Sequence, residues 1–242
     1  MPLFTRTWVK KNIGSFATLV HRDFPNVPEH YDYSEKNRVR RYMVKQTSAS
    51  LDPKSKRIRM LFMPSVWAID LYEFSQKFRI DSAHSLAVEH NHFYAEHLRS
   101  WVEAADQLVG GVPFKGMQIY EGKMSEATRE VSGPFEVANL DFISPWNREV
   151  RESVKNLLQR DLLTIPAVLF ITLNATDWIR SIHEKKTDKS LAQLMPARIY
   201  RLSHKTKYTC HYRWHMDWIG EGGSKMLTIA FTVHAKEKRV ES

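Results

Sequence analysis

The chain has 242 residues, enough for one large domain or for one domain with an appendage. Its hydrophobic content of 43% can fill a core, which excludes a wholly disordered chain. A net charge of +9 and a pI near 9.6 favour polyanionic partners: nucleic acid, an acidic membrane surface or an acidic protein.

Membrane insertion and secretion are not expected from the sequence. The longest apolar stretch, around residues 60–72, is interrupted by Pro64 and Asp70. The first residues lack the apolar core of a signal peptide. The single cysteine, Cys210, excludes an internal disulfide and fits a reducing compartment. We therefore expect a soluble, cytoplasmic protein without a membrane partner.

The positive charge is concentrated in residues 36–59, where only Asp52 opposes nine lysines and arginines. Such a segment is either a solvated arm or a nucleic-acid contact. The expected phosphate contacts are Arg38, Arg40, Arg41, Lys54, Lys56 and Arg57. We interpret residues 1–58 as a basic N-terminal extension, with a short helix over residues 8–20, and residues 59–242 as one α/β domain.

From Arg59 onward, short apolar runs alternate with helical patterns. The pattern predicts strands at residues 59–63, 85–89, 115–121, 135–141 and 167–173. It predicts helices over residues 65–78 and 92–109, one starting at Pro145 with Ser144 as its N-cap, and one starting near residue 176. Alternating strands and helices predict an open, mostly parallel, Rossmann-like sheet covered on both faces.

The C-terminal part predicts an antiparallel hairpin. Residues 207–218 alternate strictly, the turn "GEGG" follows, and residues 225–233 return as a second strand. One face of the first strand is expected to carry Tyr208, Cys210, Tyr212, Trp214, Met216 and Trp218.

Acidic side chains, Glu89, Glu121 and Asp141, end three of the predicted strands. Ligands of such sheets bind outside the carboxyl ends of the strands. Glu89, at the end of "SLAVE", can accept two hydrogen bonds from ribose hydroxyls; the alternative is a loop acid or an ion pair. In "FEVANLDFISPWN", Asp141 can orient a target amine, and Trp146 or Phe142 can stack on a base. The alternatives are a capping acid and an ordinary buried tryptophan.

This order of elements resembles the class I S-adenosylmethionine-dependent methyltransferases. The features that carry the resemblance are Glu89, the run "NLDFISPW" and the terminal hairpin, and it covers residues 59–234. "FEVANLDFISPW" is also similar to a region of tRNA guanine dimethyltransferases. The resemblance implies S-adenosylmethionine as cofactor and a DNA or RNA base as substrate. It implies cofactor contacts from Pro64, Ser65, Glu89, Glu121 and Asn139, and catalytic roles for Asp141, Pro145 and Trp146.

The sequence departs from that family after the first strand, where "LFMPSVWAID" replaces the expected glycine-rich loop. The alternative is therefore a catalytically degenerate subunit that binds nucleic acid or a protein partner, including a second copy of the chain. No metal site is expected. His211 and His215 lie on one face of a predicted strand, but about 13 Å apart.

Overall fold

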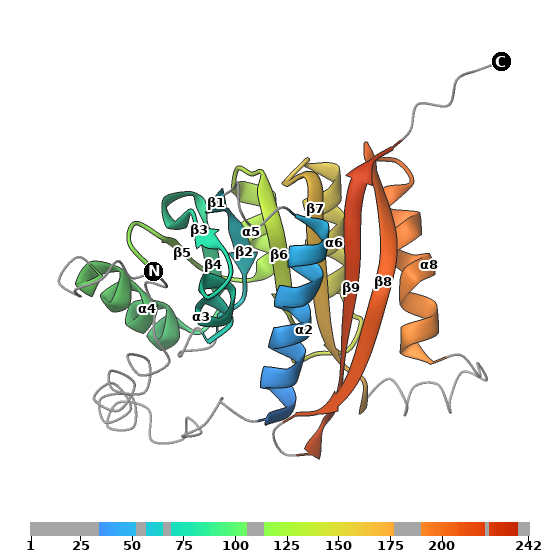
Figure 1. Cartoon of the computed structure of the whole chain (residues 1–242), viewed down its shortest axis with the longest axis horizontal. Helices are drawn as coiled ribbons and strands as arrows, with labels where there is room; N and C mark the ends of the chain where they lie inside the picture. The colour runs from blue at the N-terminus through green and yellow to red at the C-terminus, as the bar shows by residue number, and fades with distance from the viewer. Residues whose placement is uncertain are drawn as a thin grey trace.

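The computed structural model describes residues 34–51, 57–64, 69–105, 114–176, 190–220 and 223–236. Seven strands form one sheet in the order β5-β4-β2-β6-β7-β9-β8 (Figure 1). They are β2 (Met60–Phe62), β4 (Leu86–Glu89), β5 (Gln118–Glu121), β6 (Phe135–Asp141), β7 (Leu163–Asn174), β8 (Tyr208–Ile219) and β9 (Lys225–Ala235).

Strands β2, β4, β5, β6 and β7 are parallel, whereas β9 is antiparallel to both β7 and β8. The chain runs outward from β2 to β4 and β5, and then returns to place β6 on the other side of β2. The strand order therefore reverses between β2 and β6. The predicted mostly parallel sheet with a C-terminal antiparallel hairpin is confirmed. A separate parallel pair joins β1 (Arg57–Ile58) to β3 (Arg79–Ile80).

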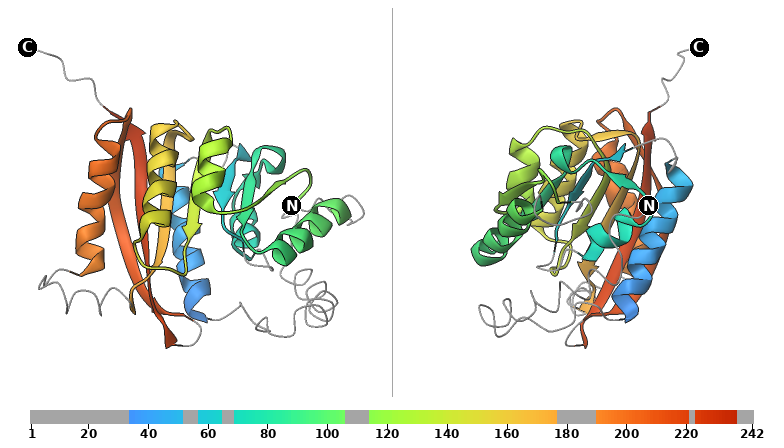
Figure 2. Two further views of the ribbon diagram at one scale, coloured as in Figure 1. Left: turned by 180° about the vertical axis from the view of Figure 1, so that it is seen from behind. Right: turned by 60° about the vertical axis from the view of Figure 1, so that its left-hand side comes forward.

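Helices cover both faces of the sheet (Figures 1 and 2). One face carries α2 (Ser34–Ser50), α3 (Ile69–Ser75) and α4 (His92–Ala104). The other carries α5 (Met124–Glu130), α6 (Arg148–Gln159) and α8 (Leu191–Ser203). A single 3-10 turn, η1 (Ser82–His84), precedes β4. In the described ranges, no helix is long and apolar enough to span a membrane.

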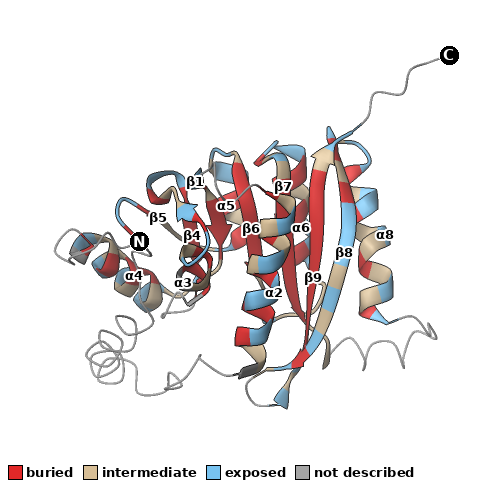
Figure 3. Cartoon of the chain, viewed as in Figure 1, coloured by how far each residue is buried: buried red, intermediate tan, exposed pale blue. Residues whose placement is uncertain are grey.

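Helix α2 lies within the segment that the sequence assigned to an extension, yet it packs on the sheet. Val39 and Met43 are buried with Phe62, Phe74 and Phe170 in the core of that face. Buried positions are visible along α2 in Figure 3. Their spacing of four residues places both on one side of the helix. Helix α2 therefore contributes to the core of the sheet domain. The division of the chain into residues 1–58 and 59–242 stays a prediction.

Arg40, predicted as a phosphate contact, is instead enclosed between α2 and α3. Its Nε donates to Asp70 Oδ1 at 2.6 Å, and the two side chains are 1% and 6% exposed. A second nitrogen, Nη1, donates to Asn37 Oδ1 at 2.8 Å. The prediction for Arg40 is wrong because a buried guanidinium cannot reach a phosphate backbone.

The predicted alternation of β8 is broken by an irregularity in register. Tyr212 pairs with Phe231, but Trp214 pairs with Ala230, so one residue is inserted in β8 between them. As a result Tyr208 and Cys210 join the core under α6 and α8, whereas Trp218 joins the core under α2. The six side chains predicted on one face are therefore divided between two.

Helix α6 begins three residues later than predicted. Asn147, not Ser144, is its N-cap, and its Oδ1 accepts a hydrogen bond from Val150 N at 3.0 Å. Ser144 belongs to the loop before the helix, where its carbonyl accepts from Asn174 N at 3.0 Å. This bond ties the loop after β6 to the end of β7.

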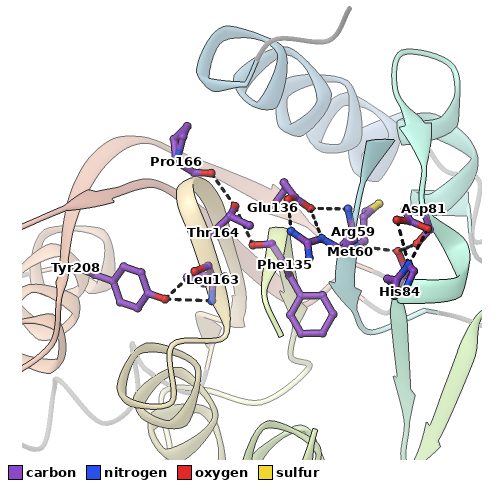
Figure 4. A network of polar contacts seen from close by, with 11 residues as sticks. Arg59, Met60, Asp81, His84, Phe135, Glu136, Leu163, Thr164, Pro166 and Tyr208 are labelled. Atoms are coloured by element: carbon purple, nitrogen blue, oxygen red, sulfur yellow. Dashed lines mark hydrogen bonds and ion pairs between the residues drawn. The ribbon is translucent and has the colours of Figure 1, made fainter. Parts of the chain in front are cut away.

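The amino ends of the strands are held by a polar network (Figure 4). Arg59 Nη2 donates to Glu136 Oε1 at 2.6 Å, and Arg59 N donates to Glu136 Oε2 at 2.7 Å. Beside them, the Tyr208 hydroxyl donates to the Leu163 carbonyl at 2.7 Å. These bonds join β6 to the β1–β2 segment and β8 to β7.

Candidate active site

A cavity of about 360 Å³ opens at the carboxyl ends of β2, β4 and β6. This is where the strand order reverses, the usual place for a ligand in an open α/β sheet. Its volume lies within the range of small-molecule sites. Its lining combines apolar side chains with a few charged ones and includes Lys36, Pro64, Glu89, Gly122, Asp141 and Phe142.

Glu89 ends β4, as the sequence predicts, and it lines this cavity. Its Oε1 accepts a hydrogen bond from Asn91 N at 2.9 Å, and His90 Nδ1 lies 3.3 Å from the same oxygen. Burial raises the pKa of Glu89, and the backbone hydrogen bond from Asn91 opposes that effect. The carboxylate is thus fixed by the turn after β4 and directed at a mostly apolar space.

Gly122 lines the cavity in place of Glu121. Its φ of +153° disfavours any residue with a side chain, and a Cβ there would lie 2.7 Å from the Tyr120 ring. Glu121 instead accepts from His92 Nδ1 at 2.7 Å and from Arg99 Nη1 at 2.9 Å. These bonds lower the pKa of Glu121 and direct it toward α4, outside the cavity.

Asp141 ends β6 and forms an ion pair across the cavity wall with Lys36, from the first turn of α2. Lys36 Nζ lies 2.6 Å from Asp141 Oδ2, and the side chains are 14% and 12% exposed. The ammonium also lies 5.8 Å from the centre of the Trp218 ring. Helix α2 therefore supplies Lys36 to the cavity wall, and β8 places Trp218 beside it. The ends of the parallel strands alone do not provide these side chains.

The charge of Lys36 is maintained by its neighbours. Burial lowers the pKa of the ammonium, but Asp141 and Asp70 raise it more, so that the pKa lies above its ordinary value. Lys36 is therefore a hydrogen-bond donor at neutral pH and cannot serve as a base. Sequence reasoning missed Lys36 because it was one cation in a basic run, and only the packing of α2 brings it to Asp141.

Three other predicted site residues lie outside the cavity lining. Trp146 packs against the core under α6 and α8, with the Arg198 guanidinium 5.7 Å from its ring centre. This position agrees with the alternative interpretation of Trp146, a tryptophan that packs against the core instead of stacking on a base. Pro145 precedes it in the same loop. Asn139 is buried on β6, two residues before Asp141, and its Oδ1 has no hydrogen-bond partner among the residues that the structure describes.

Ser65, Lys54 and Lys56 lie outside the described residues. From the glycine-poor segment, Met63 and Pro64 line the cavity. Arg38, Arg41 and Arg57 are exposed.

The outer side of α2 carries cations and an aromatic ring. Arg38, Arg41 and Lys45 are exposed at helical spacing, and Tyr42 among them is 46% exposed. The Tyr42 ring packs edge-on against Trp214 of β8, with centres 6.1 Å apart. We call Arg38, Arg41, Tyr42 and Lys45 the basic stripe.

One group of potential metal ligands occurs in the described part of the chain: His92, Glu96 and Glu121. All three are exposed, and the guanidinium of Arg99 pairs with both carboxylates. Because Arg99 already pairs with Glu96 and Glu121, we interpret this cluster as a surface ion-pair network that links α4 to β5.

No protein-family model matches the sequence, and no curated protein matches it either. Solved structures do match the fold. An O-methyltransferase from Bacillus cereus, in complex with S-adenosylhomocysteine, superposes with a TM-score of 0.56 and 12% identity, over 94% of this chain and 90% of that one.

A proposed O-methyltransferase from Klebsiella pneumoniae gives a TM-score of 0.52 and 14% identity, over 92% of this chain and 90% of that one. TYW2 from P. horikoshii, in complex with MeSAdo, gives 0.50 and 11%, over 88% of this chain and 67% of that one. At such identities the likeness concerns the fold alone: this chain has the Rossmann-like fold of the class I S-adenosylmethionine-dependent methyltransferases.

Proposed function

We propose that the protein is an S-adenosylmethionine-dependent methyltransferase that acts on nucleic acid. The observation that carries the proposal is the cavity at the reversal of strand order, with Glu89 at the end of β4 and Gly122 at the end of β5. A carboxylate at this place can accept hydrogen bonds from ribose hydroxyls.

The residues present suit such a cofactor. Met63, Val88 and Phe142 offer apolar surface for a purine ring and a methylene chain. Gly122, directly after β5, places no side chain in the cavity. The bound cofactor would supply an electrophilic methyl group on a sulfonium. The part of the protein would be to hold that group and an acceptor in line at short distance.

Nucleic acid as the substrate is favoured by charge. The chain carries a net charge of +9. The basic stripe lies on the outer side of α2, the helix that also supplies Lys36 to the cavity. Arginine and lysine contact phosphates, and an exposed tyrosine offers a surface on which a base can stack.

A melting scan with S-adenosylhomocysteine tests cofactor binding. A ligand present at 100 times its dissociation constant adds about 2.7 kcal/mol to stability, which should raise the melting temperature of a chain of this size by roughly 5–10 °C. Glu89→Ala should reduce the shift. The absence of any shift at millimolar ligand would favour the alternative, a subunit that keeps the fold without catalysis.

A further inference from the structure

The pair of Lys36 and Asp141 presents a hydrogen-bond donor and an acceptor side by side in the cavity. Their contact uses one ammonium hydrogen and one carboxylate oxygen, Oδ2. An ammonium carries three donors, and a carboxylate has about four acceptor positions. In the described part of the chain, Lys36 donates no second hydrogen bond and Asp141 Oδ1 accepts none. The pair therefore keeps bonding capacity for a ligand that enters the cavity.

The position of this pair is fixed before any ligand binds. The Trp218 ring beside Lys36 is itself held by a hydrogen bond from its Nε1 to Thr228 Oγ1 at 3.0 Å. One turn along α2, the buried bond from Arg40 to Asp70 anchors the helix. Groups held in this way lose little freedom when a substrate arrives, which favours catalysis by positioning.

We propose that Lys36 and Asp141 select a hydroxyl group as the methyl acceptor, so that the reaction is O-methyl transfer. This inference rests on the proposed function and adds the acceptor atom to it. A hydroxyl has one donor and two lone pairs. Its hydrogen can donate to Asp141 Oδ1, and one lone pair can accept from Lys36 Nζ. The second lone pair is then left to attack the methyl group.

A neutral amine fits this pair less well. It has a single lone pair, and that lone pair must face the methyl group for attack. The Lys36 ammonium, kept charged by Asp141 and Asp70, would hydrogen-bond to the same lone pair and block it. The amine-orienting role that the sequence suggested for Asp141 is therefore replaced by a paired role with Lys36.

The transfer balances with these groups alone. The oxygen–carbon bond forms as the carbon–sulfur bond of the sulfonium breaks, and the electron pair of that bond stays on sulfur as a neutral thioether. The hydroxyl proton passes to the Asp141 carboxylate and then to water. Lys36 stays protonated throughout and stabilises the negative charge that develops on oxygen as the proton leaves.

Two kinds of molecule supply such a hydroxyl. RNA carries a ribose 2′-hydroxyl at every nucleotide, whereas DNA lacks it. A small aromatic alcohol offers the same chemistry in a phenol. The basic stripe favours RNA, and the test separates the two sources by giving each acceptor its own arm.

The test measures transfer of labelled methyl from S-adenosylmethionine to total RNA in one arm and to catechol in the other. The RNA is digested, and ribose-methylated nucleosides are separated from base-methylated ones by mass spectrometry. The proteins are the parent, Lys36→Met, Lys36→Arg and, as a matched control, Lys77→Met, which removes an exposed lysine between α3 and β3. Melting shifts with S-adenosylhomocysteine are recorded for all four.

The expected product is O-methylated. Lys36→Met should lower its rate by about 10²–10³-fold, as loss of one donor to a developing oxyanion does. Lys36→Arg should retain part of the activity, Lys77→Met should match the parent, and the melting shift should persist in all. If Lys36→Met does not fold, the double variant Lys36→Met/Asp141→Asn, which leaves no unpaired charge, should show the same loss.

Three results would overturn the inference. They are a base-methylated product, an O-methylated product whose rate is unchanged in Lys36→Met, and no product in either arm although S-adenosylhomocysteine still shifts the melting temperature. A missing shift would overturn the proposed function as well. The shift therefore distinguishes failure of cofactor binding from failure of the acceptor assignment.

Discussion

Arg40 and Asp70 form the most deeply buried ion pair in the described part of the chain, at 1% and 6% exposure. Taking one partner from such a pair leaves the other charge buried and unpaired. Arg40→Met should therefore lower the free energy of unfolding by about 3–5 kcal/mol, as measured by urea denaturation. Arg41→Met, on the exposed side of the same helix, should change it by no more than about 0.5 kcal/mol. Equal effects of the two variants would contradict the packing of α2.

Asp70 also predicts how stability depends on pH. Burial raises its pKa, but the charges of Arg40 and Lys36 outweigh burial, so that the pKa in the folded protein lies below the ordinary 3.8. Its contribution to stability is thus fully present above about pH 4 and is lost as the pH falls through the lower folded value. Unfolding free energies of the parent should fall over that acidic range, and Asp70→Asn should flatten the dependence. An unchanged slope would count against the pair.

At the scale of elements, α2 serves as part of the core. It covers one face of the sheet with Val39 and Met43 and brings Lys36 to the cavity. Deleting residues 1–50 should cost about 1.5–3 kcal/mol for each of those two side chains, in addition to the ion pair with Asp70. A protein starting at Leu51 should therefore melt well below one starting at Tyr33. Equal melting temperatures would instead indicate that α2 is part of an N-terminal extension, as the sequence predicted, and does not stabilise the domain.

Most strands of the seven-stranded sheet could be predicted from sequence, because they are apolar runs bounded by turn residues or, in β8, a segment in which apolar and polar residues alternate. The same reasoning failed for α2, whose buried Val39, Met43 and Thr47 are hidden among cations. It also missed α8, because a proline such as Pro196 disfavours the interior of a helix. Pro196 lies inside that helix, which begins with a reciprocal cap between Ser190 and Gln193. Capping and burial of the helix outweigh the proline there.

The residues of the candidate site also fall into two groups, those that could be predicted from sequence and those that could not. Glu89 and Asp141 could be predicted because acids at strand ends converge wherever parallel strands end together. Lys36 could not, because it reaches Asp141 from a helix 105 residues away in sequence. The same holds for Trp218, which lies beside Lys36 from β8. Such long-range contacts depend on packing, which local patterns do not record.

At the scale of the whole molecule, the charge distribution predicts how nucleic-acid binding responds to salt. If Arg38, Arg41 and Lys45 contact phosphates, replacing all three with glutamine should reduce the salt slope by about 2.7. The melting temperature should barely change, because exposed charges contribute little to stability. Replacing Arg129, Arg201 and Lys205, which are exposed on or just after the helices of the opposite face, should leave the slope unchanged. A parent slope near zero would contradict nucleic-acid binding.

A methyltransferase function requires that the cavity lined by Glu89 bind the methyl-donor cofactor. Calorimetric titration with S-adenosylhomocysteine tests it directly, using the parent, Glu89→Gln and, as control, Glu103→Gln, an exposed acid near the end of α4. We predict one site per chain. Loss of the charged acceptor should weaken binding by about 10- to 100-fold in Glu89→Gln, while Glu103→Gln binds as the parent does. No heat of binding in the parent, or equal affinity in all three proteins, would contradict the account.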